Sequence, residues 1–169
     1  LTKKLDELKK QNKKALVGYL VAGDPDLDST LDLMHMFVQS GVDVIEVGVP
    51  FTDPIAEGPI IQRAHDRAIT KKTSLEDIFK LITKFRLKDN ETPIVLMGYL
   101  NAFIFFRHLI EENKNNSVDS ILVVDIPGEL NIADYGIKNE NINTISLISP
   151  TTKADRIKSI ANNSSGFIY

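Results

Sequence analysis

The sequence has 169 residues, of which 43% are hydrophobic, so it can form one core of ordinary size. Its net charge of −3 excludes the global basic field by which proteins bind nucleic acids or anionic membranes. The absence of cysteine excludes disulfides, thiolate zinc sites and a cysteine nucleophile.

The first part of the sequence alternates between helical and strand patterns. Residues 1–11 have leucines at helical spacing and no apolar signal-peptide segment, and no apolar run approaches the roughly 20 residues of a membrane span. We therefore expect a soluble, cytoplasmic protein without membrane contact. The next elements in order are a strand over residues 15–22, a helix over 27–40 that Gly41 ends, and a strand over 42–47.

The middle of the sequence continues this alternation. Pro59 stands at the first turn of a short predicted helix. A second helix starts at Thr73, where Glu76 three residues later indicates a capping box. The predicted strand over residues 93–98 follows. The buried face of the second helix is predicted to hold Leu75, Ile78, Phe79, Ile82 and Phe85.

The remaining residues repeat the same units. The expected elements are a helix over residues 101–112, a strand over 118–124, a weakly patterned helix within 128–143, a strand over 144–149, a helix from Thr151 with Asp155 supporting its cap, and a sixth strand in "GFIY".

This alternation predicts an α/β fold with a parallel sheet, and the near-continuous Val, Ile and Leu runs indicate that both faces of the sheet are covered. An open doubly wound sheet and a (β/α)8 TIM barrel both fit. No Gly-x-Gly-x-x-Gly follows the first strand, which weakens the first layout. A barrel takes about 250 residues. We interpret residues 1–169 as a single TIM-barrel domain with about the first six βα units, incomplete at its C-terminus.

Glu46 is the first candidate for function, because it is the one acid in the apolar strand "VIEVGV". Burial raises the pKa of a carboxyl group, which suits proton transfer. The alternative is a structural glutamate bound to a buried Lys, Arg or backbone donor. Glu57, on the loop that follows, would add a second carboxylate over the same pocket, although an exposed loop glutamate is usually only solvated.

Other polar residues near the strand ends have weaker signals. Asp53 in "TDP" is expected to bond the backbone two residues on, with contact to a partner protein as the lesser option. Asp125 repeats the strand-end acid pattern, and Tyr99 follows the third strand, where a phenol lines a pocket or packs at a helix start. The three histidines lie on predicted helices without metal-ligand spacing, so we expect no metal site.

Five segments together resemble the tryptophan synthase alpha subunit family. They are "YLVAGDPD", "GVDVIEVGVPFTDPIAEGPIIQ", "PIVLMGYLN", "VDSILVVDIP" and "SPTTKADRI", in the family's order, and the resemblance covers essentially the whole sequence. It implies a TIM-barrel lyase of tryptophan biosynthesis that cleaves indole-3-glycerol phosphate to indole and glyceraldehyde 3-phosphate by a retro-aldol reaction. It also implies an α2β2 heterotetramer with the β subunit, in which only the β subunit carries a cofactor, pyridoxal phosphate.

The resemblance assigns roles to individual residues. Glu46 matches the catalytic glutamate that relays the proton, and Glu57 stands where the family most often has the aspartate that bonds the indole N–H. Asp125 has a supporting role, and Asp53 lies on the loop that meets the β subunit. No residue of this sequence can be named as a phosphate ligand. The positions that match the family's indole pocket are Tyr19, Ile61, Met97, Tyr99, Leu122, Val124, Leu147 and Tyr169.

Two alternatives to the lyase stay open. A catalytically degenerate barrel would act only as an activating partner of a β subunit. The second alternative is another phosphate-binding barrel enzyme, such as an isomerase. The paired acids and the absence of Lys from the first three strands weigh against it.

Overall fold

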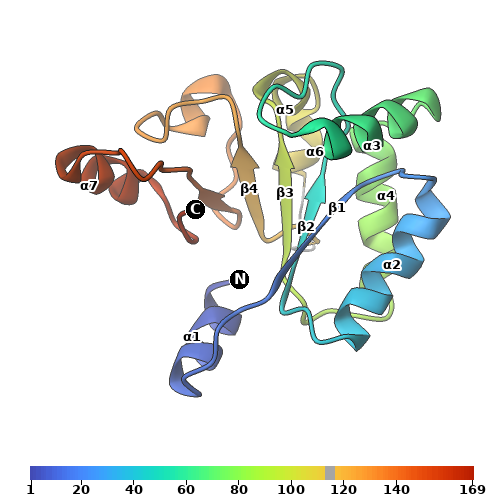
Figure 1. Ribbon diagram of the computed structural model, residues 1–169, viewed down its shortest axis with the longest axis horizontal. Coiled ribbons are helices and arrows are strands. Elements are labelled where there is room, and N and C mark those ends of the chain that lie inside the picture. The colour runs from blue at the N-terminus through green and yellow to red at the C-terminus, as the bar shows by residue number, and fades with distance from the viewer. Residues whose placement is uncertain (113–116) are drawn as a thin grey trace.

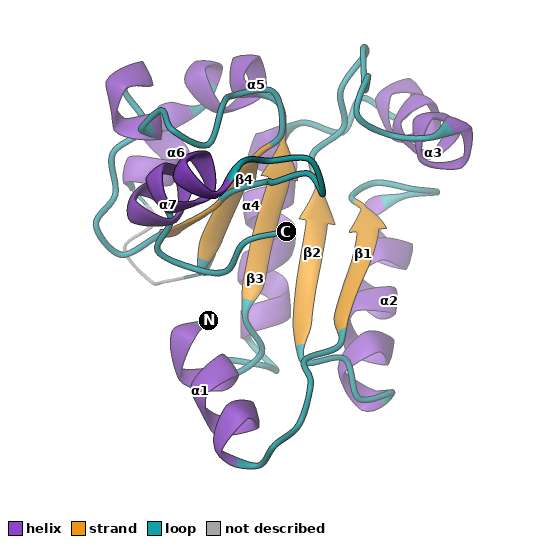
Figure 2. Ribbon diagram, turned by 60° about the vertical axis from the view of Figure 1, so that its left-hand side comes forward, coloured by secondary structure: helices purple, strands orange, loops and turns teal. Residues whose placement is uncertain are grey.

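The computed structural model describes residues 1–112 and 117–169, and its centre is a five-stranded parallel sheet (Figures 1 and 2). Each strand pairs with the next along the sequence, so the order is β1-β2-β3-β4-β5. A doubly wound sheet reverses its order at a switch point, and this sheet does not. The fold is therefore α/β with the strand order of a TIM barrel. The strands are β1 (Val17–Val21), β2 (Val44–Gly48), β3 (Ile94–Gly98), β4 (Ser120–Val123) and β5 (Asn143–Ile145).

Helices pack against the outer face of the sheet and form the larger core. There α2 (Leu27–Gln39) packs against both β1 and α4 (Leu75–Arg86). The aliphatic residues of β2, β3 and β4 that face outward meet the buried side chains of these helices. As predicted, Gly41 ends α2, with a φ of +92° that favours glycine. The other helices are α3 (Pro59–Thr70), α5 (Leu100–Phe105), α6 (Arg107–Glu111) and α7 (Ala154–Asn163).

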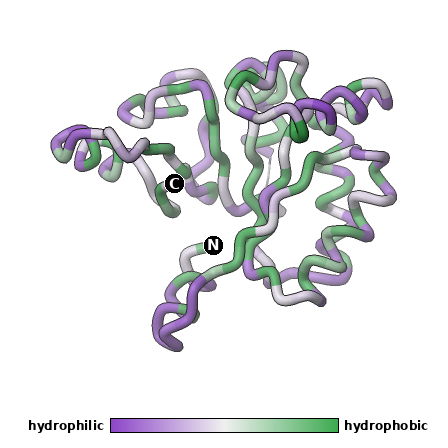
Figure 3. The backbone as a smooth tube through the Cα atoms, viewed as in Figure 1, coloured by the Kyte–Doolittle hydropathy of each residue, from purple (hydrophilic) through white to green (hydrophobic). Residues whose placement is uncertain are grey.

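The inner face of the sheet holds a smaller core. Val44, Val95, Leu122 and Ile145 meet there at alternate positions of neighbouring strands. Helix α1 (Thr2–Lys10) lies at the N-terminal ends of the strands, as Figure 2 shows, and it is largely hydrophilic where β1 is mostly hydrophobic (Figure 3). This core fills one end of the inner face. Polar side chains lie at the other end, where the strands finish.

Three predicted helices differ from the observed ones. The capping box is made one residue later than expected, by Ser74 and Asp77 in place of Thr73 and Glu76, so that the buried Leu75 becomes the first helical residue. The predicted helix over residues 101–112 is broken at Phe106 into α5 and α6. Helix α7 begins at Ala154, after a turn in which the Ser149 N–H donates to the Thr152 hydroxyl.

The C-terminal third contains less regular structure than predicted. In place of the helix predicted within residues 128–143 there is a 3₁₀ helix, η1 (Ile132–Tyr135), which ends at Gly136 with a φ of +81°, and β5 begins at Asn143. Asparagine side chains bond local N–H groups here and so compete with a helix, as when Asn139 accepts from the Asn141 N–H. The predicted sixth strand is reduced to one parallel bridge, Ser146 to Ile168. Within the described residues, no helix combines the length and apolarity that crossing a membrane requires.

Candidate active site

A cavity of about 350 Å³ opens on the inner face of the sheet, and inner-facing residues of β1 to β4 line it. Strand residues form its floor, and the β2–α3 loop, α3 and the residues after β5 form its sides. The structure brings together eight of the predicted site residues in this lining: Tyr19, Glu46, Glu57, Ile61, Met97, Leu122, Leu147 and Tyr169. Two carboxylates therefore face one mostly apolar space.

Glu46 reaches the cavity from the middle of β2 and is only 4% exposed. Its Oε2 accepts a hydrogen bond from the Tyr169 hydroxyl at 2.5 Å, whereas its Oε1 is buried without a hydrogen-bond partner among the described residues. Burial raises the pKa of the Glu46 carboxyl group, and the bond from Tyr169 partly opposes this shift. If Glu46 were a purely structural glutamate, we expected a buried Lys, Arg or backbone donor to bind it. Among the described residues, the group that binds it is the phenol of Tyr169.

Glu57 reaches the same cavity from the β2–α3 loop. Its carboxylate accepts a hydrogen bond from the Tyr99 hydroxyl, and that hydroxyl accepts from the Ala56 N–H at 2.9 Å. The side-chain amide of Gln62, on the first turn of α3, donates to the Glu57 carbonyl at 2.8 Å. The position of Glu57 is thus fixed through both its side chain and its main chain.

Tyr99 lies behind the cavity and does not line it. Its side chain is buried, its ring stacks on Phe51 with centroids 4.5 Å apart, and its hydroxyl holds the loop that carries Glu57. Burial and the bond to Glu57 raise the pKa of Tyr99 to about 12. Val124 is also outside the lining, because it packs against the inner core.

The two predicted aspartates lie away from the cavity. Asp125 is exposed and accepts from the Leu100 N–H at 2.8 Å, which fixes the start of α5. Asp53 is exposed, and the predicted bond from its side chain to the backbone two residues on is wrong. The main-chain carbonyl of Asp53 accepts from the Ile55 N–H, and the carboxylate accepts from the Thr52 hydroxyl.

Sequence reasoning missed two residues that shape this site. His65 of α3 is buried, and its Nδ1 accepts from the Phe51 N–H at 3.1 Å, which anchors the start of the β2–α3 loop. One sequence feature could have pointed to His65: it lies one helical turn after Gln62, on the helix that follows the loop. Gly48 lies under Tyr19, and a Cβ there would come within 2.3 Å of the Tyr19 hydroxyl.

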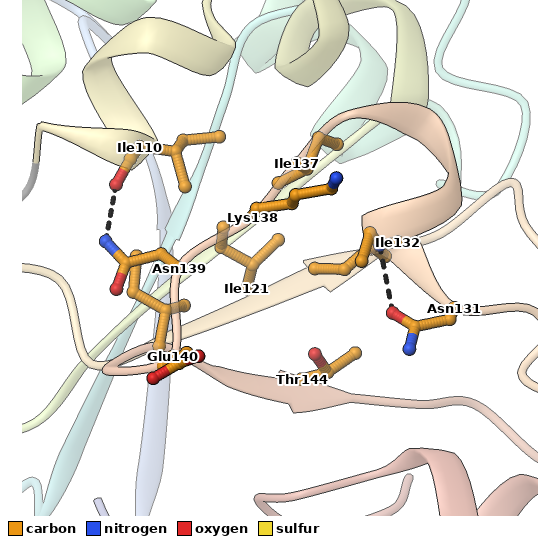
Figure 4. Close-up of a pocket in the computed structure, with 11 residues that line it drawn as sticks. Ile110, Ile121, Asn131, Ile132, Ile137, Lys138, Asn139, Glu140 and Thr144 are labelled. Atoms are coloured by element: carbon orange, nitrogen blue, oxygen red, sulfur yellow. Dashed lines mark hydrogen bonds between the residues drawn. The ribbon is translucent and has the colours of Figure 1, made fainter.

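A second cavity, of about 320 Å³, lies between η1 and β4 on the other side of the sheet (Figure 4). Isoleucines form much of its wall, and its asparagines fasten the surrounding backbone: Asn139 donates to the Ile110 carbonyl, and Asn131 accepts from the Ala133 N–H. None of the predicted site residues lines it. No group of three His, Cys, Asp or Glu side chains able to hold a metal ion occurs in residues 1–112 and 117–169.

Comparison with known proteins gives one consistent match. A family model of the tryptophan synthase alpha chain matches residues 5–169. The tryptophan synthase alpha chain of Neisseria gonorrhoeae is 47% identical over 159 residues, which are 92% of this chain and 61% of the relative. The chain thus spans about three-fifths of the length of curated relatives that it matches.

Solved structures agree with this match. The crystal structure of tryptophan synthase subunit alpha from Legionella pneumophila superposes with a TM-score of 0.91 at 40% identity, covering 99% of this chain and 65% of that one. A chain in the crystal structure of the tryptophan synthase complex from Pyrococcus furiosus superposes with a TM-score of 0.82 at 38% identity, covering 92% of this chain and 64% of that chain.

Proposed function

The chain belongs to the tryptophan synthase alpha chain family, and on that premise we propose that the full-length protein is a lyase that cleaves indole-3-glycerol phosphate to indole and glyceraldehyde 3-phosphate. The reaction would serve the last step of tryptophan biosynthesis. We also propose that residues 1–169 are one continuous part of a single barrel domain in the cytoplasm.

The observation that supports this proposal best is the pair of carboxylates in one apolar cavity, each bound to its own phenol. Glu46 is buried, so its carboxyl pKa is raised toward the range in which a group both takes and gives a proton. In the proposed reaction Glu46 takes the proton of the glycerol hydroxyl next to the ring and returns it at C3 of the indole.

Glu57 is proposed to bind the indole N–H. The loop holds its carboxylate in the same cavity as Glu46, and a negative charge there stabilises the positive charge that develops on the ring nitrogen. Ile61, Met97, Leu122 and Leu147 supply apolar walls suited to a flat aromatic ring. We propose that the Tyr99 hydroxyl, which donates to the Glu57 carboxylate, holds this longer side chain in place.

The partner is proposed to be a tryptophan synthase β subunit in an α2β2 complex. The related Pyrococcus furiosus alpha chain belongs to a tryptophan synthase a2b2 complex. In this chain, Ile55 and Phe105 are 83% and 75% exposed on the segments that follow β2 and β3, at the same end of the sheet as the cavity. We propose that they form part of the partner surface together with Asp53, and that pyridoxal phosphate is carried only by the partner.

The test is to incubate the full-length protein with indole-3-glycerol phosphate, alone and with a β subunit, and to measure the indole released. Indole formation that depends on Glu46 supports the lyase. A protein that stimulates the β subunit and releases no indole under either condition would be an activator only, and the proposed reaction would be wrong.

A further inference from the structure

The cavity and the residues behind it contain three phenols and two carboxylates, so one phenol has no carboxylate to bind. Tyr169 donates to Glu46, and Tyr99 donates to Glu57. The Tyr19 hydroxyl is buried, and it has no hydrogen-bond partner in the described part of the chain. A buried hydroxyl without a partner destabilises a folded protein, so a group of this kind indicates a site where a ligand supplies the bond.

The pairing of β1 with β2 places Tyr19 beside Glu46 in the cavity. Tyr19 and Glu46 are direct neighbours across the β1–β2 pairing, and both side chains line the cavity. Tyr19 packs against the buried cluster of Val21, Ala64 and Ala68, and its ring extends over Gly48, the next inner-facing position of β2 after Glu46. These packing contacts position the Tyr19 hydroxyl near Glu46 and leave it free to form a hydrogen bond.

A second buried atom close by also lacks a partner. Oε1 of Glu46 makes no hydrogen bond to any described residue. Tyr19 can donate a bond and Oε1 can accept one. A ligand hydroxyl does both at once, because it donates its proton to Oε1 while its oxygen accepts from Tyr19. An alcohol therefore satisfies both unpaired atoms.

We propose that the Tyr19 hydroxyl donates a hydrogen bond to the substrate oxygen whose proton Glu46 removes. This inference rests on the proposed lyase function and adds a third polar group to it. In the step, the O–H bond breaks and its proton passes to Glu46 and from Glu46 to C3 of the ring, then a C=O bond forms on the hydroxyl-bearing carbon as the C–C bond to the ring breaks. The electron pair of the broken bond enters the C3-protonated indole ring and neutralises its nitrogen.

Tyr19 keeps its proton throughout this step and so remains a donor. Burial and the nearby charges of Glu57 and Glu46 raise the pKa of its phenol well above the ordinary value. As negative charge builds on the substrate oxygen, the bond from Tyr19 strengthens, as do the bonds to developing oxyanions in other enzymes. Tyr19 would then act mainly in the transition state.

The test is Tyr19→Phe in the full-length protein, assayed for indole release from indole-3-glycerol phosphate. We expect kcat and kcat/KM to fall together by roughly 10- to 100-fold, because most of the stabilisation by this bond arises in the transition state. Thermal stability should not fall, because the hydroxyl makes no bond within the described chain. The matched control is Tyr135→Phe in η1, outside the cavity lining, which should keep wild-type activity.

A binding measurement separates this role from general damage to the cavity. An analogue with hydrogen in place of the cleaved carbon's hydroxyl should bind wild type and Tyr19→Phe equally well by calorimetry. Full activity in Tyr19→Phe, with an active wild type, overturns this inference and leaves the lyase intact. A fall in stability, or weaker binding of the analogue, also overturns it. An inactive wild type would instead overturn the proposed lyase.

Discussion

The Tyr169 hydroxyl donates a hydrogen bond to Oε2 of Glu46 at 2.5 Å, and the two residues are 123 positions apart in the sequence. Tyr169 follows Ile168, whose bridge to Ser146 extends the sheet by one contact beyond β5. The partner of the central carboxylate is therefore positioned by the far end of the described sheet, while β2 positions the carboxylate itself.

Tyr169→Phe should move the acid limb of the kcat/KM profile to higher pH. The Tyr169 bond stabilises the ionised carboxylate and lowers the pKa of Glu46, in opposition to burial. Without it, that pKa rises further, and less Glu46 is ionised at a given pH. We expect a shift of about one pH unit in the profile for indole release. An acid limb that stays in place or moves to lower pH would contradict the assignment of Glu46 as the proton acceptor.

Tyr99→Phe should loosen the loop that carries Glu57. The variant removes the donor to the Glu57 carboxylate and the acceptor of the Ala56 N–H, while the stack on Phe51 remains. Indole release should fall by about tenfold, since a bond to a charged group is lost. Hydrogen exchange at the Ala56 amide should accelerate. Unchanged exchange would show that the loop is held by other contacts.

Gly48→Ala should destabilise the protein by about 2 kcal/mol, as overpacking of a buried site does. A Cβ at this position would lie 2.3 Å from the Tyr19 hydroxyl and 2.8 Å from its ring, so the tyrosine must move. Denaturant unfolding measures the effect. Gly58→Ala is the matched control, because its Cβ would meet no described atom within 4 Å and its φ of −78° suits alanine. Equal stability of the two variants would argue against the observed place of Tyr19.

His65 should make stability depend on pH. Burial lowers its pKa below the ordinary value of 6.5, so the folded protein binds fewer protons there than the unfolded chain. The free energy of unfolding is therefore not reduced by His65 above about pH 6.5, and it declines as the pH falls below that value. Charged groups near the ring, Glu57 and Asp66, oppose this shift only partly.

His65→Asn is the variant that tests this, because its amide oxygen can accept the Phe51 N–H in place of Nδ1. Unfolding by urea between about pH 5 and pH 7.5 should show a smaller loss of stability on acidification than in wild type. His35 and His108 are present in both proteins, so the difference belongs to His65. Parallel pH dependences would contradict the prediction.

The sequence predicts the local features of this fold well. The alternation of elements leads to the parallel sheet and its sequential order, and Glu46 stands out because burying a lone carboxyl group in an apolar strand costs free energy. The capping box shows the limit: Thr73 with Glu76 and Ser74 with Asp77 both fit the pattern, and the burial of Leu75 selects the second pair. Residues 128–143 lack a strong period, so local turns replace the expected helix.

Contacts between distant residues are what the sequence does not reveal. Tyr99 looks like a pocket residue beside its strand, but its hydroxyl is used by a loop more than 40 positions earlier. The sequence marks His65 only as a residue type that binds metals, and its bond to Phe51 needs the three-dimensional path of the loop. The vacant hydrogen-bonding capacity of Tyr19 likewise follows only from which carboxylate each phenol reaches.

The most direct test of the central claim is indole release from indole-3-glycerol phosphate by the full-length protein and its Glu46→Gln variant, each with a β subunit present. Glutamine keeps the shape of Glu46 and the bond from Tyr169 but cannot take up the proton. We predict that wild type releases indole and that the variant is slower by at least about 100-fold, the usual scale of general acid–base catalysis. No indole from wild type, or equal rates in the two proteins, would contradict the account.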